Sequence, residues 1–270
     1  MTAPDLELCR LLSERIRGAL AARDGRLLVV GLCGAQGSGK STLAAALPAR
    51  LDRAGIAAAT LSLDDLYLTR AERQDLAQRV HPLLATRGVP GTHDVALGMA
   101  TLDALARGAP AALPRFDKGT DDRTPTSDWP LAPAQTQVLL LEGWCVGALP
   151  QPAAALTKPV NCLEAEEDPD GIWRASANAA LAGAYHDLFA RIDLLVLLAA
   201  PDWSVVTAWR EEQEAELRKV SPGAMTPLQV QRFIQHYERL TRWILAEMPA
   251  RADLTVRLGE ARAVLEITQR

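Results

Sequence analysis

Eight residues near the start of the chain constrain its fold more than any other segment. Residues 34–41 read GAQGSGKS and fit the phosphate-binding loop pattern G-x-x-x-x-G-K-[ST] without a mismatch. The apolar run 27–33 before them predicts a buried strand, and the Ala- and Leu-rich run 42–51 after them predicts a helix. Glycines let the backbone turn tightly and point its N–H groups at phosphate oxygens. The predicted nucleotide-binding residues are therefore Gly34, Ala35, Gln36, Gly37, Ser38, Gly39, Lys40 and Ser41.

Two side chains of this pattern, and one acid further along the chain, have predicted chemical roles. Lys40 is expected to reach the β- and γ-phosphates, and the Ser41 hydroxyl is expected to ligate Mg²⁺. Glu142 directly follows the apolar run 138–141, where a P-loop enzyme places the carboxylate that holds Mg²⁺ or its waters. The alternative for Glu142 is a strand-end acid that faces solvent. We expect Ser41 and Glu142 to form the metal site.

Predicted strands alternate with predicted helices along the chain. The strands are expected at 27–33, 57–63, 138–141, 194–198 and 253–258, and the helices at 6–22, 42–51, from Arg70 onward, 95–107, 171–190, 203–219 and 226–250. This alternation predicts an α/β fold of the P-loop NTPase type, a parallel sheet flanked by helices on both faces. We expect residues 1–270 to form a single domain with an N-terminal helix within 1–24 and substrate or lid insertions near 81–133 and 203–230.

Composition narrows the environment and the partners. The chain has 49% hydrophobic and 23% charged residues and a net charge of −4, which gives no support for a nucleic-acid partner. No apolar run approaches the roughly 18 residues that span a membrane, and the polar, acidic N-terminus does not resemble a secretory signal. The four cysteines are far apart, so we expect buried free thiols in a cytoplasmic protein. The oligomeric state is left open, and a monomer is compatible with the sequence.

Two carboxylates and a set of basic residues are candidates for work on a second substrate. Asp64 and Asp65 end the predicted strand 57–63, and they point in alternate directions, so only one of them is expected to face the phosphates. One would act as the base for a substrate hydroxyl; the alternative is a helix N-cap pair. His93 lies in a Gly- and Thr-rich loop, where it could contact substrate. The candidate cations along the γ-phosphate path are Arg115, Lys118, Arg123, Arg210 and Arg218.

The absence of other motifs separates the function classes that use a P-loop. The guanine-reading N-K-x-D pattern, the L-S-G-G-Q transporter signature and a strand ending in Asp-Glu, as in ring ATPases, do not occur. A compact small-molecule kinase is the class that fits. A non-catalytic nucleotide-sensing module is the alternative, although it would need neither Asp64 nor the charged loops.

Several longer blocks resemble known kinases. LSLDDLYLT, from Leu61, resembles the uridine kinase, phosphoribulokinase and pantothenate kinase group. Five further blocks together are similar to the D-glycerate 3-kinase family, and the resemblance runs from about Val30 to about Leu258. These blocks are RGVPGTHD, LPRFDKGTDDR, LLLEGWCVGA, EEDPDGIWR and FIQHYERLTRW. The chain departs from the family after Arg174, where it reads ASAN in place of a bulkier stretch with an aromatic residue.

The resemblance implies phosphorylation of D-glycerate at its 3-hydroxyl, with ATP and Mg²⁺, to give 3-phosphoglycerate. It places Asp64 at the position of the base, extends the ATP loop to Thr42 and assigns Glu142 to the strand-end acid. The residues expected to contact the acceptor are Asp65, Tyr67, His93, Arg115, Asp117 and Lys118. A basic group in the PRFDKG block suits a substrate that is itself a carboxylate. Uridine, pantothenate and sugar-phosphate acceptors are set aside only by this resemblance, and Arg239 and Thr241 receive no role.

Overall fold

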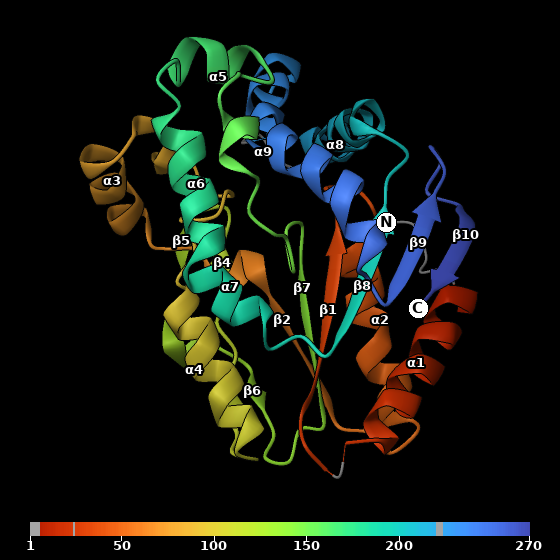
Figure 1. Ribbon diagram of the computed structural model, residues 1–270. Coiled ribbons are helices and arrows are strands. Elements are labelled where there is room, and N and C mark those ends of the chain that lie inside the picture. Colours follow the sequence, from red (N-terminus) through yellow and green to blue (C-terminus); the bar gives the residue numbers. More distant parts are fainter. Residues whose placement is uncertain (1–5, 24, 220–223) are drawn as a thin grey trace.

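A six-stranded sheet forms the centre of the molecule in the computed structural model, which describes residues 6–23, 25–219 and 224–270 (Figure 1). The strand order is β10-β9-β8-β1-β7-β2, and all neighbouring strands are parallel except β10, which is antiparallel to β9. The strands are β1 (Leu28–Gly34), β2 (Ala58–Ser62), β7 (Val138–Gly143), β8 (Leu194–Ala199), β9 (Leu254–Leu258) and β10 (Val264–Gln269). The carboxyl ends of β1, β2 and β7 therefore share one edge of the sheet.

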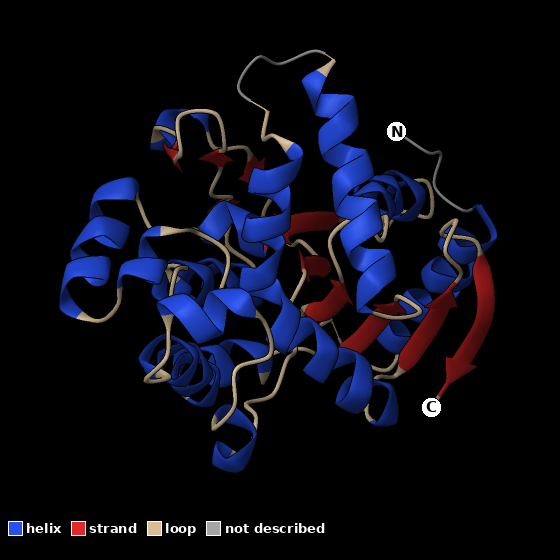
Figure 2. Ribbon diagram, turned by 90° about the horizontal axis from the view of Figure 1, so that it is seen from above, coloured by secondary structure: helices blue, strands red, loops and turns tan. Residues whose placement is uncertain are grey.

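Helices cover both faces of the sheet (Figures 1 and 2). One face packs against α1, α2 and α8, and the other packs against α4, α6, α7 and α9. The helices are α1 (Leu6–Ala21), α2 (Lys40–Asp52), α3 (Arg70–Arg79), α4 (Val95–Ala106), α5 (Cys162–Glu167), α6 (Ile172–Ala182), α7 (Ala184–Phe189), α8 (Trp203–Arg218) and α9 (Pro227–Glu247). None of the described helices is long and apolar enough to cross a membrane.

The central strand shows why this layering follows from the sequence. Successive side chains of a strand point to opposite faces of the sheet. Because β1 has apolar residues on both of its faces, it contributes side chains to both hydrophobic cores. Val29 and Cys33 pack into the core under α4 and α9, whereas Leu28, Val30 and Leu32 pack into the core under α1 and α2. A strand buried on both faces reads as a continuous apolar run, and this is the run that the sequence shows. The chain therefore has the α/β P-loop NTPase fold.

Most predicted elements are present, and four expectations need correction. The predicted helix 171–190 is two helices, α6 and α7, which meet at Gly183. The irregular segment 110–133 contains two short antiparallel pairs, β3 with β6 and β4 with β5. The antiparallel strand β10 and the short helix α5 were not predicted. Cys162 is exposed, whereas Cys9, Cys33 and Cys145 are buried as expected.

The two strand pairs within 110–133 are separate two-stranded sheets. Their strands are β3 (Ala111–Ala112), β4 (Phe116–Asp117), β5 (Asp122–Arg123) and β6 (Leu131–Ala132). The pair β4 and β5 forms a hairpin that packs near the carboxyl end of β2, next to the one-turn 3₁₀ helix Leu63–Leu66. The predicted N-terminal segment 1–24 and the predicted insertion 203–230 each include residues outside the described ranges, 1–5 and 24 in the first and 220–223 in the second.

Candidate active site

The loop between β1 and α2 has the geometry of a phosphate cradle. Gly37 and Gly39 have φ values of 79° and 86°, a region that side chains with a Cβ rarely adopt. A Cβ on Gly37 would lie 2.5 Å from Cβ of Trp209 on α8, so this position also needs glycine for space. Lys40 begins α2 and forms no ion pair with any described residue. Its ammonium is available to the phosphates of a nucleotide.

A residue from the C-terminal part of the chain, which the sequence analysis did not single out, holds the loop. Arg262, in the turn between β9 and β10, donates from Nε to the carbonyl oxygen of Gly37 at 2.7 Å. Its guanidinium lies 5.2 Å from the centroid of the Trp209 ring and pairs with Glu212. Arg262 has a positive φ of 65°, an unusual conformation for a residue with a side chain. No local motif marks this contact, because it joins segments 225 residues apart.

Ser41 and Glu142 are brought together as predicted from their positions. The Ser41 hydroxyl lies 3.4 and 3.5 Å from the two carboxylate oxygens of Glu142. Glu142 is only 6% exposed, so the alternative of an acid that faces solvent is wrong. Among the described residues this hydroxyl is the hydrogen-bond partner of the Glu142 carboxylate, and a buried charge is costly unless it is paired. An oxygen-preferring cation such as Mg²⁺, which keeps several of its own waters, fits this pair of donors.

Asp64 lies one residue into the turn that follows β2, and it is held by two donors. Tyr67 donates its hydroxyl to one carboxylate oxygen at 2.8 Å, and Lys118 donates from Nζ to the other at 2.7 Å. Burial by itself would raise the pKa of Asp64. The charges of Lys118 and Lys40 and the two hydrogen bonds outweigh burial and hold the pKa well below its usual range. Asp64 is therefore ionised at neutral pH and lies within electrostatic range of the P-loop lysine.

Asp65 has a different environment from its neighbour. Its carboxylate accepts a hydrogen bond from the backbone N–H of Phe116 at 3.1 Å and pairs with Arg115 at 3.2 Å. Burial raises the pKa of Asp65, and those two contacts counteract part of the rise. Neither aspartate caps the helix Leu63–Leu66, whose N-cap is Ser62, so the N-cap alternative is wrong. Asp65 fastens strand β4 to the end of β2 and thereby places the hairpin that carries Lys118.

The remaining predicted acceptor residues divide into two groups. Tyr67 stacks on His93 with ring centroids 4.6 Å apart, and Nδ1 of His93 lies 2.5 Å from the hydroxyl of Tyr185. Burial lowers the pKa of His93 to about 4, so this ring is neutral at pH 7 and supports Tyr67 from behind. Asp117 is exposed and accepts hydrogen bonds from Gly119 N–H and the Thr120 hydroxyl. It shapes the hairpin turn, whereas Lys118 extends from that turn to Asp64.

The other candidate cations all have partners in the described part of the chain. Arg123 pairs with Asp94 at 3.1 Å and so ties β5 to the N-terminus of α4. Arg210 pairs with Glu214 at 2.6 Å one turn along α8. Arg218 donates to the carbonyl oxygen of Met225 at 2.6 Å. None of these contacts points to a particular arginine as the one that closes over the phosphates.

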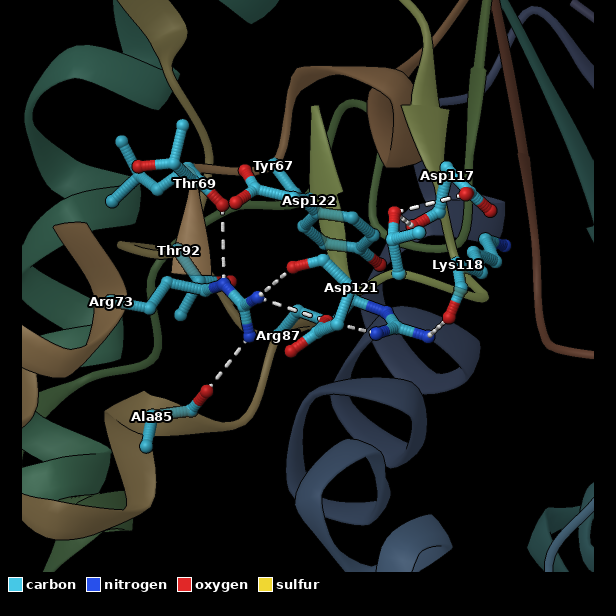
Figure 3. Close-up of polar contacts among 12 residues, drawn as sticks. Tyr67, Thr69, Arg73, Ala85, Arg87, Thr92, Asp117, Lys118, Asp121 and Asp122 are labelled. Atoms are coloured by element: carbon cyan, nitrogen blue, oxygen red, sulfur yellow. Dashed lines mark hydrogen bonds and ion pairs between the residues drawn. The ribbon is translucent and has the colours of Figure 1, made fainter. Parts of the chain in front are cut away.

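A charged cluster beside Lys118 was missed by the sequence analysis (Figure 3). Asp121 in the hairpin turn pairs with Arg73 of α3 at 2.9 Å and also with Arg87. Arg87 begins the RGVPGTHD block, which the sequence analysis treated as a loop without assigning this residue. The RGVPGTHD block indicated that this segment matters, but no sequence pattern identifies Asp121, 34 residues away, as the partner of Arg87.

Two of the blocks that carry the family resemblance form a second buried cluster. Arg239 of α9 pairs with Glu164 through two contacts of 2.6 and 2.7 Å and donates to two backbone carbonyls. Arg174 pairs with Asp168 through one contact of 3.0 Å and also donates to two backbone carbonyl oxygens. These arginines join α5, α6 and α9, which assigns Arg239 a structural role. Trp173 is 3% exposed, so the departure that follows Arg174 leaves its packing intact.

Comparison with known proteins agrees with this geometry. Residues 7–66, which contain the P-loop, match the family described as "Methylmalonyl Co-A mutase-associated GTPase MeaB". The chain is 36% identical over 224 residues to the "Uncharacterized kinase mug58" of Schizosaccharomyces pombe, and the match covers 79% of each protein. It is 34% identical over 222 residues to the "D-glycerate 3-kinase, chloroplastic" of Arabidopsis thaliana. That match covers 78% of this chain but 46% of the Arabidopsis protein.

A solved structure extends the similarity over nearly the whole chain. The "D-glycerate 3-kinase from Cryptococcus neoformans var. grubii" superposes with a TM-score of 0.82 at 28% sequence identity. The superposition covers 97% of this chain and 99% of that one. The P-loop, the strand-end acids and the hairpin segment therefore all lie within the region that is shared with a kinase.

Proposed function

This chain belongs to the P-loop kinases related to D-glycerate 3-kinase, and we propose that it transfers the γ-phosphate of ATP to the 3-hydroxyl of D-glycerate. The coarser statement, that it is an ATP-dependent P-loop kinase for a small molecule, follows from family membership. The finer statement, that the acceptor is D-glycerate, draws on the names of two relatives at 28 and 34% identity. The product would be 3-phosphoglycerate.

The observation that carries the proposal is the placement of an ionised carboxylate across from the P-loop lysine. Asp64 lies at the carboxyl end of β2, and Lys40 is close enough to lower its pKa. A base that is ionised at neutral pH and lies beside the phosphate site can accept the proton of an acceptor hydroxyl as its oxygen attacks the γ-phosphate. Lys40 would then stabilise the charge that develops on the transferred group.

The metal would be held by Ser41 and Glu142, directly or through water. When bound, Mg²⁺ supplies positive charge to the β- and γ-phosphates and so assists their orientation. The protein's own part is to keep Glu142 buried and to set the Ser41 hydroxyl beside it through the first turn of α2. The site residues, the metal and the assignment of the segments near 81–133 and 203–230 as substrate or lid insertions are parts of this proposal.

The test is a coupled assay of ADP release with purified protein, ATP and Mg²⁺. D-glycerate, L-glycerate, uridine and pantothenate would be supplied in parallel, and the product position would be read with an enzyme specific for 3-phosphoglycerate. We expect turnover with D-glycerate and formation of the 3-phosphate. Turnover with a different acceptor alone would keep the kinase and overturn the acceptor. ATP binding without turnover of any acceptor would favour the nucleotide-sensing alternative.

A further inference from the structure

In the charged cluster of Figure 3, two arginines, Arg73 and Arg87, pair with the same carboxylate, that of Asp121. Arg73 is 1% exposed and donates to the carbonyl oxygens of Leu68, Ala85 and Asp121 as well as to the Asp121 carboxylate. Arg73 by itself is therefore sufficient to neutralise Asp121 and to hold it in place. The second arginine on the same carboxylate, Arg87, is redundant for this purpose.

Arg87 differs from Arg73 in exposure and in surroundings. Its side chain is 25% exposed, and its guanidinium lies 5.5 Å from the centroid of the Phe116 ring, with Nη2 3.4 Å from the carbonyl oxygen of Lys118. It also lies within electrostatic range of the hydroxyls of Tyr67 and Tyr237, and both hydroxyls are in range of Asp64. The guanidinium of Arg87 thus lies against the hairpin turn, and Tyr67, which is in its electrostatic range, donates a hydrogen bond to the predicted base.

The backbone that presents Arg87 is firmly positioned. The Tyr237 hydroxyl of α9 donates to the carbonyl oxygen of Arg87 at 3.2 Å. Gly88 has a φ of 137°, and a Cβ there would lie 2.1 Å from the Tyr237 hydroxyl, so only glycine permits this approach. The Gly88 N–H donates to Thr92 across the turn at 3.0 Å. A fixed backbone with a partly exposed guanidinium is suited to ligand binding, because little is left to be ordered.

Lys118 provides a second cation with a replaceable partner. Its side chain is 60% exposed, and its ammonium is paired with Asp64. Each carboxylate oxygen of Asp64 accepts one hydrogen bond, one from Tyr67 and the other from Lys118. Moving the Lys118 ammonium to the carboxylate of an acceptor would leave one oxygen of Asp64 open to the acceptor hydroxyl.

We propose that Arg87 and Lys118 together form the receptor for the carboxylate of the acceptor, with Asp121 and Asp64 holding these two cations until the acceptor binds. This inference rests on the proposed function, and it narrows the acceptor class to hydroxy acids. The carboxylate of the acceptor would replace Asp121 at Arg87 and Asp64 at Lys118. No buried charge would be stranded, because Asp121 keeps Arg73 and Asp64 keeps Tyr67. Binding would thereby free the base, so that an acceptor without a carboxylate would be phosphorylated slowly.

The experiment compares D-glycerate with D-glyceramide, which has the same hydroxyls and no charge. We expect Arg87→Gln to lower kcat/KM for D-glycerate by about 10–100-fold, the range for one charge-assisted hydrogen-bonded pair, and to change KM for ATP less than about twofold. The value for D-glyceramide should stay within about twofold of the wild type. Lys118→Gln should lower kcat/KM for D-glycerate without lowering that for D-glyceramide. Arg87→Lys, which keeps the charge, should restore part of the preference for the acid.

A control and a binding measurement separate the possible failures. Arg79→Gln, on the exposed face of α3, should alter neither acceptor. An equal loss with both acceptors in Arg87→Gln, or no loss with either, would overturn the inference while leaving the kinase assignment intact. If the wild type phosphorylates neither compound, calorimetric titration of D-glycerate into the wild type and the variants supplies the comparison. Absence of binding to the wild type would then overturn the inference and the proposed acceptor together.

Discussion

The two halves of the candidate active site differ in how their positive charges are engaged. In the nucleotide half, Lys40 has no ion-pair partner among the described residues. In the acceptor half, each cation already has a carboxylate: Lys118 has Asp64, Arg115 has Asp65, Arg123 has Asp94, and Arg87 shares Asp121 with Arg73. The lysine of the nucleotide half is thus unpaired among the described residues, whereas the cations of the acceptor half are paired with carboxylates of the protein itself.

This difference indicates where selectivity is set. A preorganised phosphate cradle binds any nucleoside triphosphate and contributes little to the choice of acceptor. Cations that are already paired with a carboxylate of the protein favour an anionic ligand, which can replace that carboxylate, over a neutral ligand, which cannot. Removing a charge from the nucleotide half should therefore abolish turnover with every acceptor, and changes in the acceptor half should depend on which acceptor is offered.

The largest effect is expected from the nucleotide half. Lys40→Met removes a cation that has no ion pair with any described residue and is expected to contact the γ-phosphate, so kcat should fall by about 10³-fold with any acceptor. Steady-state kinetics with D-glycerate would measure this, and Lys158→Met, a substitution at an exposed lysine, is the matched control. A Lys40→Met enzyme with most of its rate would remove the loop lysine from the chemistry.

The two neighbouring aspartates give the next test. Asp64→Asn should lower kcat by about 10²–10⁴-fold, the range for a general base, while binding of ATP is retained. Asp65→Asn weakens the attachment of β4 through Phe116 and Arg115, so it should act mainly on KM for the acceptor. The measurement is kcat and KM for both variants. A larger loss of kcat in Asp65→Asn would reverse the assignment of the base.

A smaller effect is expected at the metal. Glu142→Gln removes the buried charge beside Ser41, so the Mg²⁺ concentration at half-maximal activity should rise about 10–100-fold. High Mg²⁺ should recover much of the rate, and chelation of Mg²⁺ should abolish it in the wild type. Titration of activity against Mg²⁺ checks both points, with the exposed Glu166→Gln as control. An unaltered titration curve would place the metal elsewhere.

The sequence predicted the nucleotide half more completely than the acceptor half, for a physical reason. The P-loop depends on local backbone conformation, so the glycine spacing around Lys40 carries most of the information. Glu142 and Asp64 could also be placed, because the carboxyl ends of parallel strands meet at one edge. The pair Arg87 and Asp121 depends on how a hairpin and a distant loop dock, and neither segment records its partner.

The same limit explains the elements that were missed. Strand β10 is mostly exposed at the edge of the sheet, so it lacks the continuous apolar run that identified β1. Arg262 reaches Gly37 only because the turn between β9 and β10 folds onto α8. The start of a helix at Arg70, in contrast, was predicted from the local sequence, and α3 begins there with a capping box formed by Thr69 and Glu72. Local signals were thus reliable, and contacts between distant segments had to come from the structure.

The smallest expected effect concerns the stability of the fold and arises from two buried histidines. Burial lowers the pKa of His93, beside Tyr67, and of His236, on α9, to about 4 in each case. Their unfolded-state pKa is near 6.5, so between about pH 6.5 and 4 the unfolded chain binds more protons than the folded one. The free energy of unfolding should therefore fall as the pH is lowered through this window, by at most about 1.4 kcal/mol per pH unit for each histidine.

Asp64 and Asp65 do not produce the same fall in the free energy of unfolding between about pH 6.5 and 4. The depressed pKa of Asp64 stabilises the folded protein above its unfolded pKa of about 3.8, and that contribution is lost only below the window. Asp65, whose pKa is raised by burial, favours folding as the pH falls and acts in the opposite direction. Urea unfolding at several pH values should show a shallower slope for His236→Gln than for the wild type, and an unchanged slope for the exposed His186→Gln. Equal slopes in all three proteins would mean that burial does not hold His236 neutral, and the α9 cluster would then have to accommodate a charge.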